Sequence, residues 1–354
     1  MIKKLLATSA LISTVALTSV SVAQTTITGS LDLTLRNTSH KKDSGALSET
    51  SMGRETQINI ANKGKLNNGL NYAAGFSLEF DGHNTAASGT NEPATISNEA
   101  VYLNLISGGT TVHVGIDWIQ NAKQDLIGAV GDIIDEVGAG TTSGAALNYA
   151  GILHPKESIG AGIVQNFGNG ITASALYVPN AGNVGTNNNG GATLNSSGSN
   201  SAYEVGLRGS NVNNSGISFE AWKNKAEKSE FSTSVDGGDT EGKAFSLGYN
   251  TGPFGLGVSK QVTQLESGVD KTSKFAQASY AVDKNLTASL VYVTTEDESV
   301  AAANRAKEKI KSLMVGYNFG PVGLLVTGSK IEDNGAITTG KDVDVLGISL
   351  NTKF

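Results

Sequence analysis

The stretch Ile27-Thr28-Gly29-Ser30-Leu31-Asp32-Leu33-Thr34-Leu35-Arg36 alternates between apolar and polar side chains from one residue to the next. Successive side chains of a β-strand point to opposite faces, because the strand repeats every two residues. The leucines therefore share one face with Ile27 and Gly29, and the charged, Ser and Thr side chains share the other. This stretch predicts a strand that separates an apolar environment from a polar one.

The same alternation recurs down the chain, at residues 72–80, 112–118, 203–208, 245–250, 312–319 and 346–354. One such strand would also suit a soluble β-sandwich. These strands, however, are numerous and run about ten residues, enough to cross a bilayer when tilted. Their polar faces carry Gly, Ser, Thr and charged groups, which suits a wet lumen. Backbone groups cannot stay unpaired in lipid, so the fold class predicted is all-β, a closed transmembrane antiparallel barrel.

Turn signals give the number of strands. Seven are short and rich in Gly, Asn, Pro or Asp: 63–69, 107–109, 168–170, 211–216, 251–253, 283–285 and 320–321. Eight are long and polar: 38–50, 84–94, 119–157, 180–200, 227–242, 266–272, 296–308 and 332–341. Alternating along the chain, these connect sixteen strands, although counts of 14 or 18 stay open. Short turns at one end and long loops at the other are typical of outer-membrane barrels.

The first residues predict an export signal. Lys3 and Lys4 precede an apolar stretch from Leu5 to about Val22, and Ser21-Val22-Ala23 supplies small residues for cleavage after Ala23. We expect residues 1–23 to be a signal peptide and residues 24–354 a single barrel domain. The alternative, a membrane anchor, fits less well because the apolar core is short and contains Ser and Thr.

Composition supports this class. The 354 residues include 44 Gly, 5 Pro and no Cys, which suits strands joined by tight turns and excludes disulfides. Lys plus Arg is 26 and Asp plus Glu is 32; losing Lys3 and Lys4 leaves 24 against 32, a net charge of −8. A negative chain argues against nucleic-acid binding and favours cations in any channel.

Several segments in order resemble general bacterial porins of Gram-negative outer membranes. They are Thr25–Leu31, the hairpin Ile58–Leu70 with its Gly-Leu turn, Asn98–Leu105 with Thr111–Gly115, and Asn166–Pro179. The chain ends in Phe354, which resembles the signal read by the barrel assembly machinery. The resemblance covers the mature chain. It implies sixteen strands, a homotrimer in contact with outer-membrane lipid and lipopolysaccharide, and passage of small hydrophilic solutes.

The family folds its third external loop into the barrel, and here the third long loop, 119–157, is the longest. It contains Asp132, Asp135 and Glu136 between glycines. The resemblance implies that these carboxylates form an acidic edge at the pore constriction, where they would concentrate cations. An ordinary solvated acidic loop is the alternative.

Polar-face residues on other strands are candidates for the lumen wall: Asp32, Arg36, Glu55, Gln57 and His113. Gln57 stands where the family usually has Arg, so the strongly basic cluster of many relatives is missing. This departure favours weak cation selectivity. Arg36 could instead be an exposed strand-end residue, and a lone His113 is more simply a pore-lining side chain than a ligand.

Catalytic and cofactor motifs are absent from the sequence: it has no phosphate-binding P-loop, no HExxH and no cysteine cluster. We therefore expect no enzyme activity, no cofactor and no metal. The leading hypothesis is general passive diffusion of ions and small polar solutes. Two alternatives stay open: a substrate-specific outer-membrane channel, and a surface adhesin or structural barrel that conducts nothing.

Overall fold

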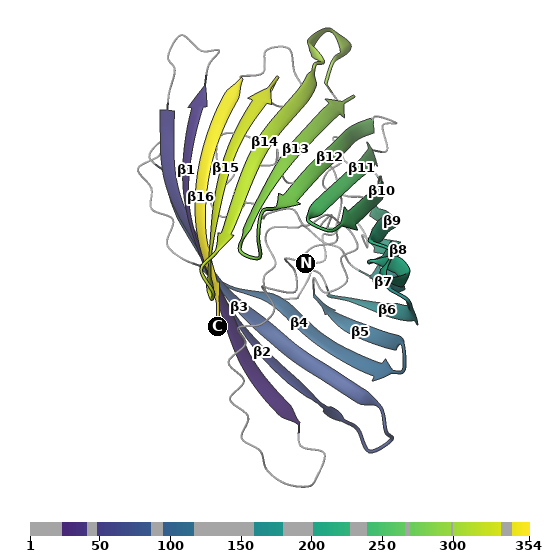
Figure 1. Ribbon diagram of the computed structural model, residues 1–354. Helices are drawn as coiled ribbons and strands as arrows, with labels where there is room; N and C mark the ends of the chain where they lie inside the picture. The colour runs from purple at the N-terminus through teal and green to yellow at the C-terminus, as the bar shows by residue number, and fades with distance from the viewer. Residues whose placement is uncertain are drawn as a thin grey trace.

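The computed structural model describes residues 23–40, 48–85, 95–116, 159–179, 201–226, 239–265, 270–298, 300–333 and 342–354. They form sixteen antiparallel strands that close into one barrel, each strand pairing with its neighbours in sequence (Figure 1). This confirms the predicted fold class and strand number. In chain order the strands are β1 Gln24–His40, β2 Ser48–Lys65, β3 Asn71–Thr85, β4 Thr95–Ser107, β5 Thr110–Ile116, β6 Ile159–Gly168, β7 Ile171–Val178, β8 Ala202–Gly209, β9 Ile217–Ala226, β10 Thr240–Thr251, β11 Phe254–Leu265, β12 Asp270–Ala281, β13 Leu286–Asp297, β14 Lys307–Asn318, β15 Val322–Glu332 and β16 Val343–Lys353.

The barrel closes where the first strand meets the last. In Figure 1 the yellow β16 lies beside the purple β1, and the register pairs Ser30 with Lys353 and His40 with Val343. Beyond the end of β16, the N–H of Phe354 donates to the carbonyl of Gly29 at 2.9 Å, and the N–H of Gly29 donates back to Phe354 at 2.6 Å. The terminal residue is therefore part of the seam that leaves the sheet without a free edge.

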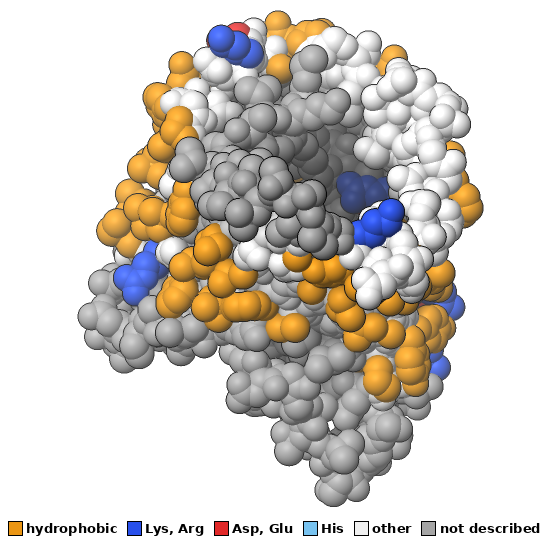
Figure 2. All heavy atoms as spheres, turned by 90° about the horizontal axis from the view of Figure 1, so that it is seen from below, with side chains coloured by type: hydrophobic (Ala, Val, Ile, Leu, Met, Phe, Trp, Pro, Cys, Tyr) orange, Lys and Arg blue, Asp and Glu red, His pale blue; other side chains and the backbone are white. Residues whose placement is uncertain are grey.

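The two faces of the wall differ as the alternation predicts. On β10, Phe245, Leu247 and Tyr249 are exposed, whereas the intervening Ser246 and Gly248 are buried. The exposed apolar side chains belong to the outer face, and Figure 2 shows hydrophobic side chains around the outside of a hollowed molecule. Side chains on the concave inner face converge and shield one another. No helix among the described residues is long and apolar enough to span a membrane.

The short turns lie where the sequence predicts them. Asn169 and Gly170 have φ of 52° and 82°, the left-handed conformation that a tight hairpin turn requires. A 3₁₀ turn, η3 (Val212–Asn214), joins β8 and β9, and another, η4 (Ala302–Asn304), lies between β13 and β14. Several strands extend into the loops predicted around them; β1, β2 and β3 have 17, 18 and 15 residues, more than the ten expected.

One feature of the inner face differs from the sequence expectation of a uniformly polar lumen. A cluster of buried apolar side chains covers the inner face of β12–β16: Phe275, Val291, Val293, Ile310, Met314, Leu325, Ile331, Val343 and Val345. We call this the inner apolar arc. Apolar residues also occupy the outer face of these strands, so period-two alternation does not reveal the arc. The predicted signal peptide lies, except for Ala23, outside the described residues.

Candidate functional site: the lumen wall

The first three strands bring acidic side chains together on the inner face. Asp32 of β1 is the direct cross-strand partner of Glu55 of β2, and Gln57 of β2 is the partner of Glu79 of β3. Asp32 also accepts a hydrogen bond from the Ser349 hydroxyl across the seam. Asp32, Glu55 and Gln57 are three of the residues that the sequence predicts for the lumen, and Asp32 alternates along β1 with the apolar Leu31 and Leu33. We call Asp32, Glu55 and Glu79 the acidic strip.

Arg36 lies on the same face of β1 as Asp32 and four residues nearer the long loops, which is about 13 Å along a strand. Its cross-strand partners are Ser51 of β2 and Gly347 of β16, whose missing side chain leaves room beside the guanidinium. The side chain is only 5% exposed. Arg36 is thus buried on the face that it shares with Asp32, and its role in the pore wall stays a prediction.

His113 of β5 lies on the inner face and is 1% exposed. Its Nδ1 lies 2.7 Å from Oδ1 of Asn104, its direct partner on β4. No group of three or more His, Cys, Asp or Glu side chains among the described residues could hold a metal. The role of His113 as a pore-lining side chain stays a prediction. Sequence reasoning overlooked Asn104, although a two-residue Gly108-Gly109 turn sets the register that pairs it with His113.

A second charged group lies on the inner face of β8 and β9. Arg208 is the direct partner of Glu220, and Glu204 is the direct partner of Asn224. Glu204, Glu220 and Asn224 are buried, at 0%, 2% and 2% exposure. The sequence placed Glu204 and Arg208 on the polar face but did not single out Glu220. Glu204, Glu220 and Asn224 are therefore more deeply buried than the acidic strip, whose three side chains are half-buried.

Charge is distributed unevenly between the two faces. We consider the described inner-face residues that lie more than two positions from either end of their strand. The charged ones are four acidic residues, Asp32, Glu55, Glu79 and Glu220, and one basic residue, Arg36. Most lysines of β9–β15 instead lie on the outer face, as Lys223, Lys243, Lys260 and Lys311 do. The loop carboxylates Asp132, Asp135 and Glu136 lie outside the described residues.

Comparison with known proteins identifies the family. The Gram-negative porin family matches residues 7–345. The chain belongs to that family. Among solved structures, it is similar to an anion-selective porin from Comamonas acidovorans, with 16% identity, a TM-score of 0.64, and coverage of 94% of this chain and 100% of that one.

A triple mutant of Rhodopseudomonas blastica porin is also similar, with 15% identity, a TM-score of 0.58 and the same coverage of both chains. At such identities these structures support the fold alone. No curated protein matches the chain by sequence. The family match thus confirms the resemblance to Gram-negative porins that the sequence predicts. This porin is a channel-forming barrel. Its family implies a location in the outer membrane.

Proposed function

We propose that this porin is a general diffusion channel through which ions and small hydrophilic solutes cross the outer membrane down their gradients, without a chemical reaction. The observation that carries the proposal is the closed barrel, which has a band of exposed apolar side chains on its outer face and polar residues such as Asp32, Arg36, Glu55 and Gln57 on the opposite face of its strands. Such a wall offers polar side chains to hydrated solutes on the inside and apolar side chains to lipid on the outside. No cofactor is required.

We propose weak cation selectivity. The acidic strip raises the local concentration of cations, and Arg36 opposes it from about 13 Å away on the same strand. Gln57, which stands where relatives usually carry Arg, adds no positive charge. The Comamonas acidovorans porin is described as anion-selective, so relatives of this fold differ in selectivity and the wall charges must decide it.

We propose that loop 119–157 folds into the lumen and that Asp132, Asp135 and Glu136 line the constriction. The inner apolar arc supports a segment inside the barrel, because apolar side chains facing water would lose the stabilisation of burial. The loop contains apolar residues such as Ile133, Ile134 and Val137 beside its carboxylates. It could therefore pack on the arc while its charges face the pore.

We propose that residues 1–23 direct export to the periplasm, that the barrel assembly machinery reads Phe354, and that the mature chains form a homotrimer surrounded by outer-membrane lipid and lipopolysaccharide. The outer faces of β3–β7 have no charged residue among the side chains described there. This uncharged sector suits contact with neighbouring protomers, whereas the lysine-bearing β9–β15 suits contact with lipid headgroups.

The test is solute uptake into liposomes that contain the purified porin. For a general channel, swelling rates should fall smoothly as sugars increase in size, regardless of sugar stereochemistry. A substrate-specific channel would instead admit one sugar or anion much faster than others of equal size. The adhesin alternative predicts no uptake. Only the smooth dependence on size is compatible with the proposal.

A further inference from the structure

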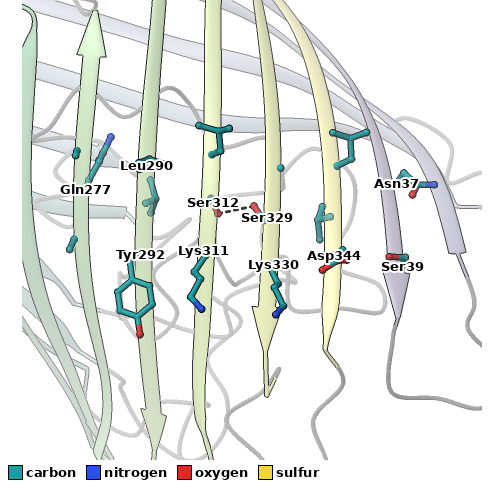
Figure 3. A pocket seen from close by; sticks show the side chains of 17 residues that line it. Asn37, Ser39, Gln277, Leu290, Tyr292, Lys311, Ser312, Ser329, Lys330 and Asp344 are labelled. Atoms are coloured by element: carbon teal, nitrogen blue, oxygen red, sulfur yellow. Dashed lines mark hydrogen bonds between the residues drawn. The ribbon is translucent and has the colours of Figure 1, made fainter.

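The outer wall of β12–β16 and β1 carries an open groove of 830 Å³ (Figure 3). The strand register arranges most of its lining residues in two adjacent rows that cross all six strands. The row nearer the short turns consists of Ala278, Leu290, Leu313, Gly328, Leu346 and Asn37. The row nearer the long loops consists of Ala276, Tyr292, Lys311, Lys330, Asp344 and Ser39.

The row nearer the short turns makes the apolar floor of this outer-wall groove. Gly328 has no side chain, and a Cβ placed there would have no atom within 4 Å, so the wall is hollowed at this point. Leu290, Leu313 and Leu346 surround the hollow and are 61%, 50% and 51% exposed. Together they present an apolar surface suited to an alkyl chain.

The other row brings two ammonium groups together. Lys311 and Lys330 are direct cross-strand partners, an arrangement of like charges that is unfavourable unless an anion neutralises it. Lys311 Nζ and Lys330 Nζ lie 3.3 and 3.2 Å from the same oxygen of Glu332, and Lys309 Nζ lies 3.9 Å from its other oxygen. These three lysines outnumber Glu332 and Asp344, the cross-strand partner of Lys330, by one formal charge.

On several strands an outer-face lysine lies at the same spacing along the strand from an aromatic residue near the short turns. Lys311 is six residues from Tyr317 on the outer face of β14, about 20 Å along the strand. The same six-residue spacing separates Lys243 from Tyr249, Lys260 from Phe254, and Lys274 from Tyr280. Tyr317 and these other aromatic residues lie near the short turns. The lysines therefore mark the upper edge of the apolar band, where lipid headgroups of the outer leaflet begin.

We propose that the outer-wall groove binds a phosphorylated, acylated glycolipid of the outer leaflet, the chemistry of lipopolysaccharide. A phosphate lies between Lys311 and Lys330, an acyl chain covers Gly328 and the leucines, and Tyr292 and Ser39 offer hydroxyl groups to the sugar. This site rests on the proposed location in the outer membrane. It goes beyond general lipid contact because it names the residues that select a phosphate next to an alkyl chain.

The test uses the purified, folded porin in detergent and native mass spectrometry with two probes, diphosphorylated lipid A and its fully dephosphorylated form. The double variant Lys311→Gln, Lys330→Gln should bind diphosphorylated lipid A at least about tenfold more weakly. Lys284→Gln, in a short turn at the opposite end, is the matched control and should bind like the wild type. Equal binding of both probes by the wild type would overturn the proposal, as would unchanged binding by the double variant.

A second variant, Gly328→Leu, fills the floor without altering charge, and because a Cβ at this position has no atom within 4 Å, folding should be preserved. It should weaken lipid A binding while leaving any inorganic phosphate binding unchanged. If inorganic phosphate competes fully with lipid A, the lysines are merely a phosphate site and the proposal is wrong. Channel conductance of each variant, measured separately, should equal that of the wild type. A loss of lipid binding with intact conductance distinguishes this site from the channel function.

Discussion

Asp32 of β1 and Glu55 of β2 face each other as direct cross-strand partners on the inner face of the barrel. Two carboxylates placed opposite one another repel, an arrangement that destabilises a strand pair. The hydrogen bond from Ser349 to Asp32 partly compensates for this by tying the carboxylate to β16. We expect this acidic pair to act on the ions that pass it.

Neutralising this pair should reduce the preference for cations. A unit charge 10 Å from an ion in water contributes about 0.4 kcal/mol, about a twofold change in local ion concentration. Each charge also lowers the local Cl⁻ concentration about twofold, so Asp32→Asn with Glu55→Gln should lower the ratio of K⁺ to Cl⁻ permeability by up to about sixteenfold. The measurement is the reversal potential in a planar bilayer under a KCl gradient.

The control for that experiment is Glu296→Gln, which removes a carboxylate from the outer face of β13. It should leave the reversal potential unchanged because the wall separates it from the ions. If the Asp32 and Glu55 variant shifted the potential no more than this control, the acidic strip would not determine selectivity.

The sequence predicts which face of the sheet a side chain occupies better than it predicts the register between neighbouring strands. In β10, Phe245-Ser246-Leu247-Gly248-Tyr249 alternates cleanly, and the exposures follow it. In β13, Val291-Tyr292-Val293 is apolar on both faces, so the inner apolar arc could not be predicted from period two. Registers within short hairpins follow from turn length. Predicting the outer-wall groove would also require the registers of β13 with β14 and of β15 with β16. Long loops join these strands, so the sequence does not determine those registers.

The hydrogen bond between His113 and Asn104 should stabilise the wall. Asn104→Ala removes one partner of a buried imidazole and should lower the free energy of unfolding by about 1–3 kcal/mol. Asn68→Ala, which changes the same residue type and removes an exposed hydrogen bond from the N–H of Leu70, should cost less than about 0.5 kcal/mol. Urea unfolding followed by circular dichroism measures both; equal effects would contradict a special role for this pair.

The role of Phe354 in assembly can be separated from its role in the seam. The ring lies over Gly29, where an added Cβ would meet it, but both seam hydrogen bonds come from the backbone of Phe354. Phe354→Ala should therefore keep the stability of the refolded barrel and yet reduce its amount in the outer membrane severalfold. Phe319→Ala, another exposed aromatic near a short turn, should not reduce that amount. Equal amounts for both variants would rule out a signal in the terminal ring.

The turn between β12 and β13 should make stability depend on acid pH. The N–H groups of Asn285 and Leu286 donate to Asp283 Oδ1 at 2.6 and 2.9 Å, and they hold the pKa of this carboxyl below its usual 3.8. Because the folded pKa is the lower one, the stabilisation is complete above pH 3.8 and is lost as pH falls through the folded pKa. Asp283→Ala should destabilise the barrel at pH 7 and much less at pH 2. A difference independent of pH would contradict this account.

Single-channel recording of the purified porin in a planar bilayer tests the central claim, an open water-filled pore, most directly. In symmetric KCl the wild-type protein should insert in discrete, ohmic current steps, in groups of three if the homotrimer forms, and without any added ligand. Protein that is shown by circular dichroism to be folded, and by electrophoretic mobility to be a closed barrel, but that gives no stable conductance would contradict the channel itself.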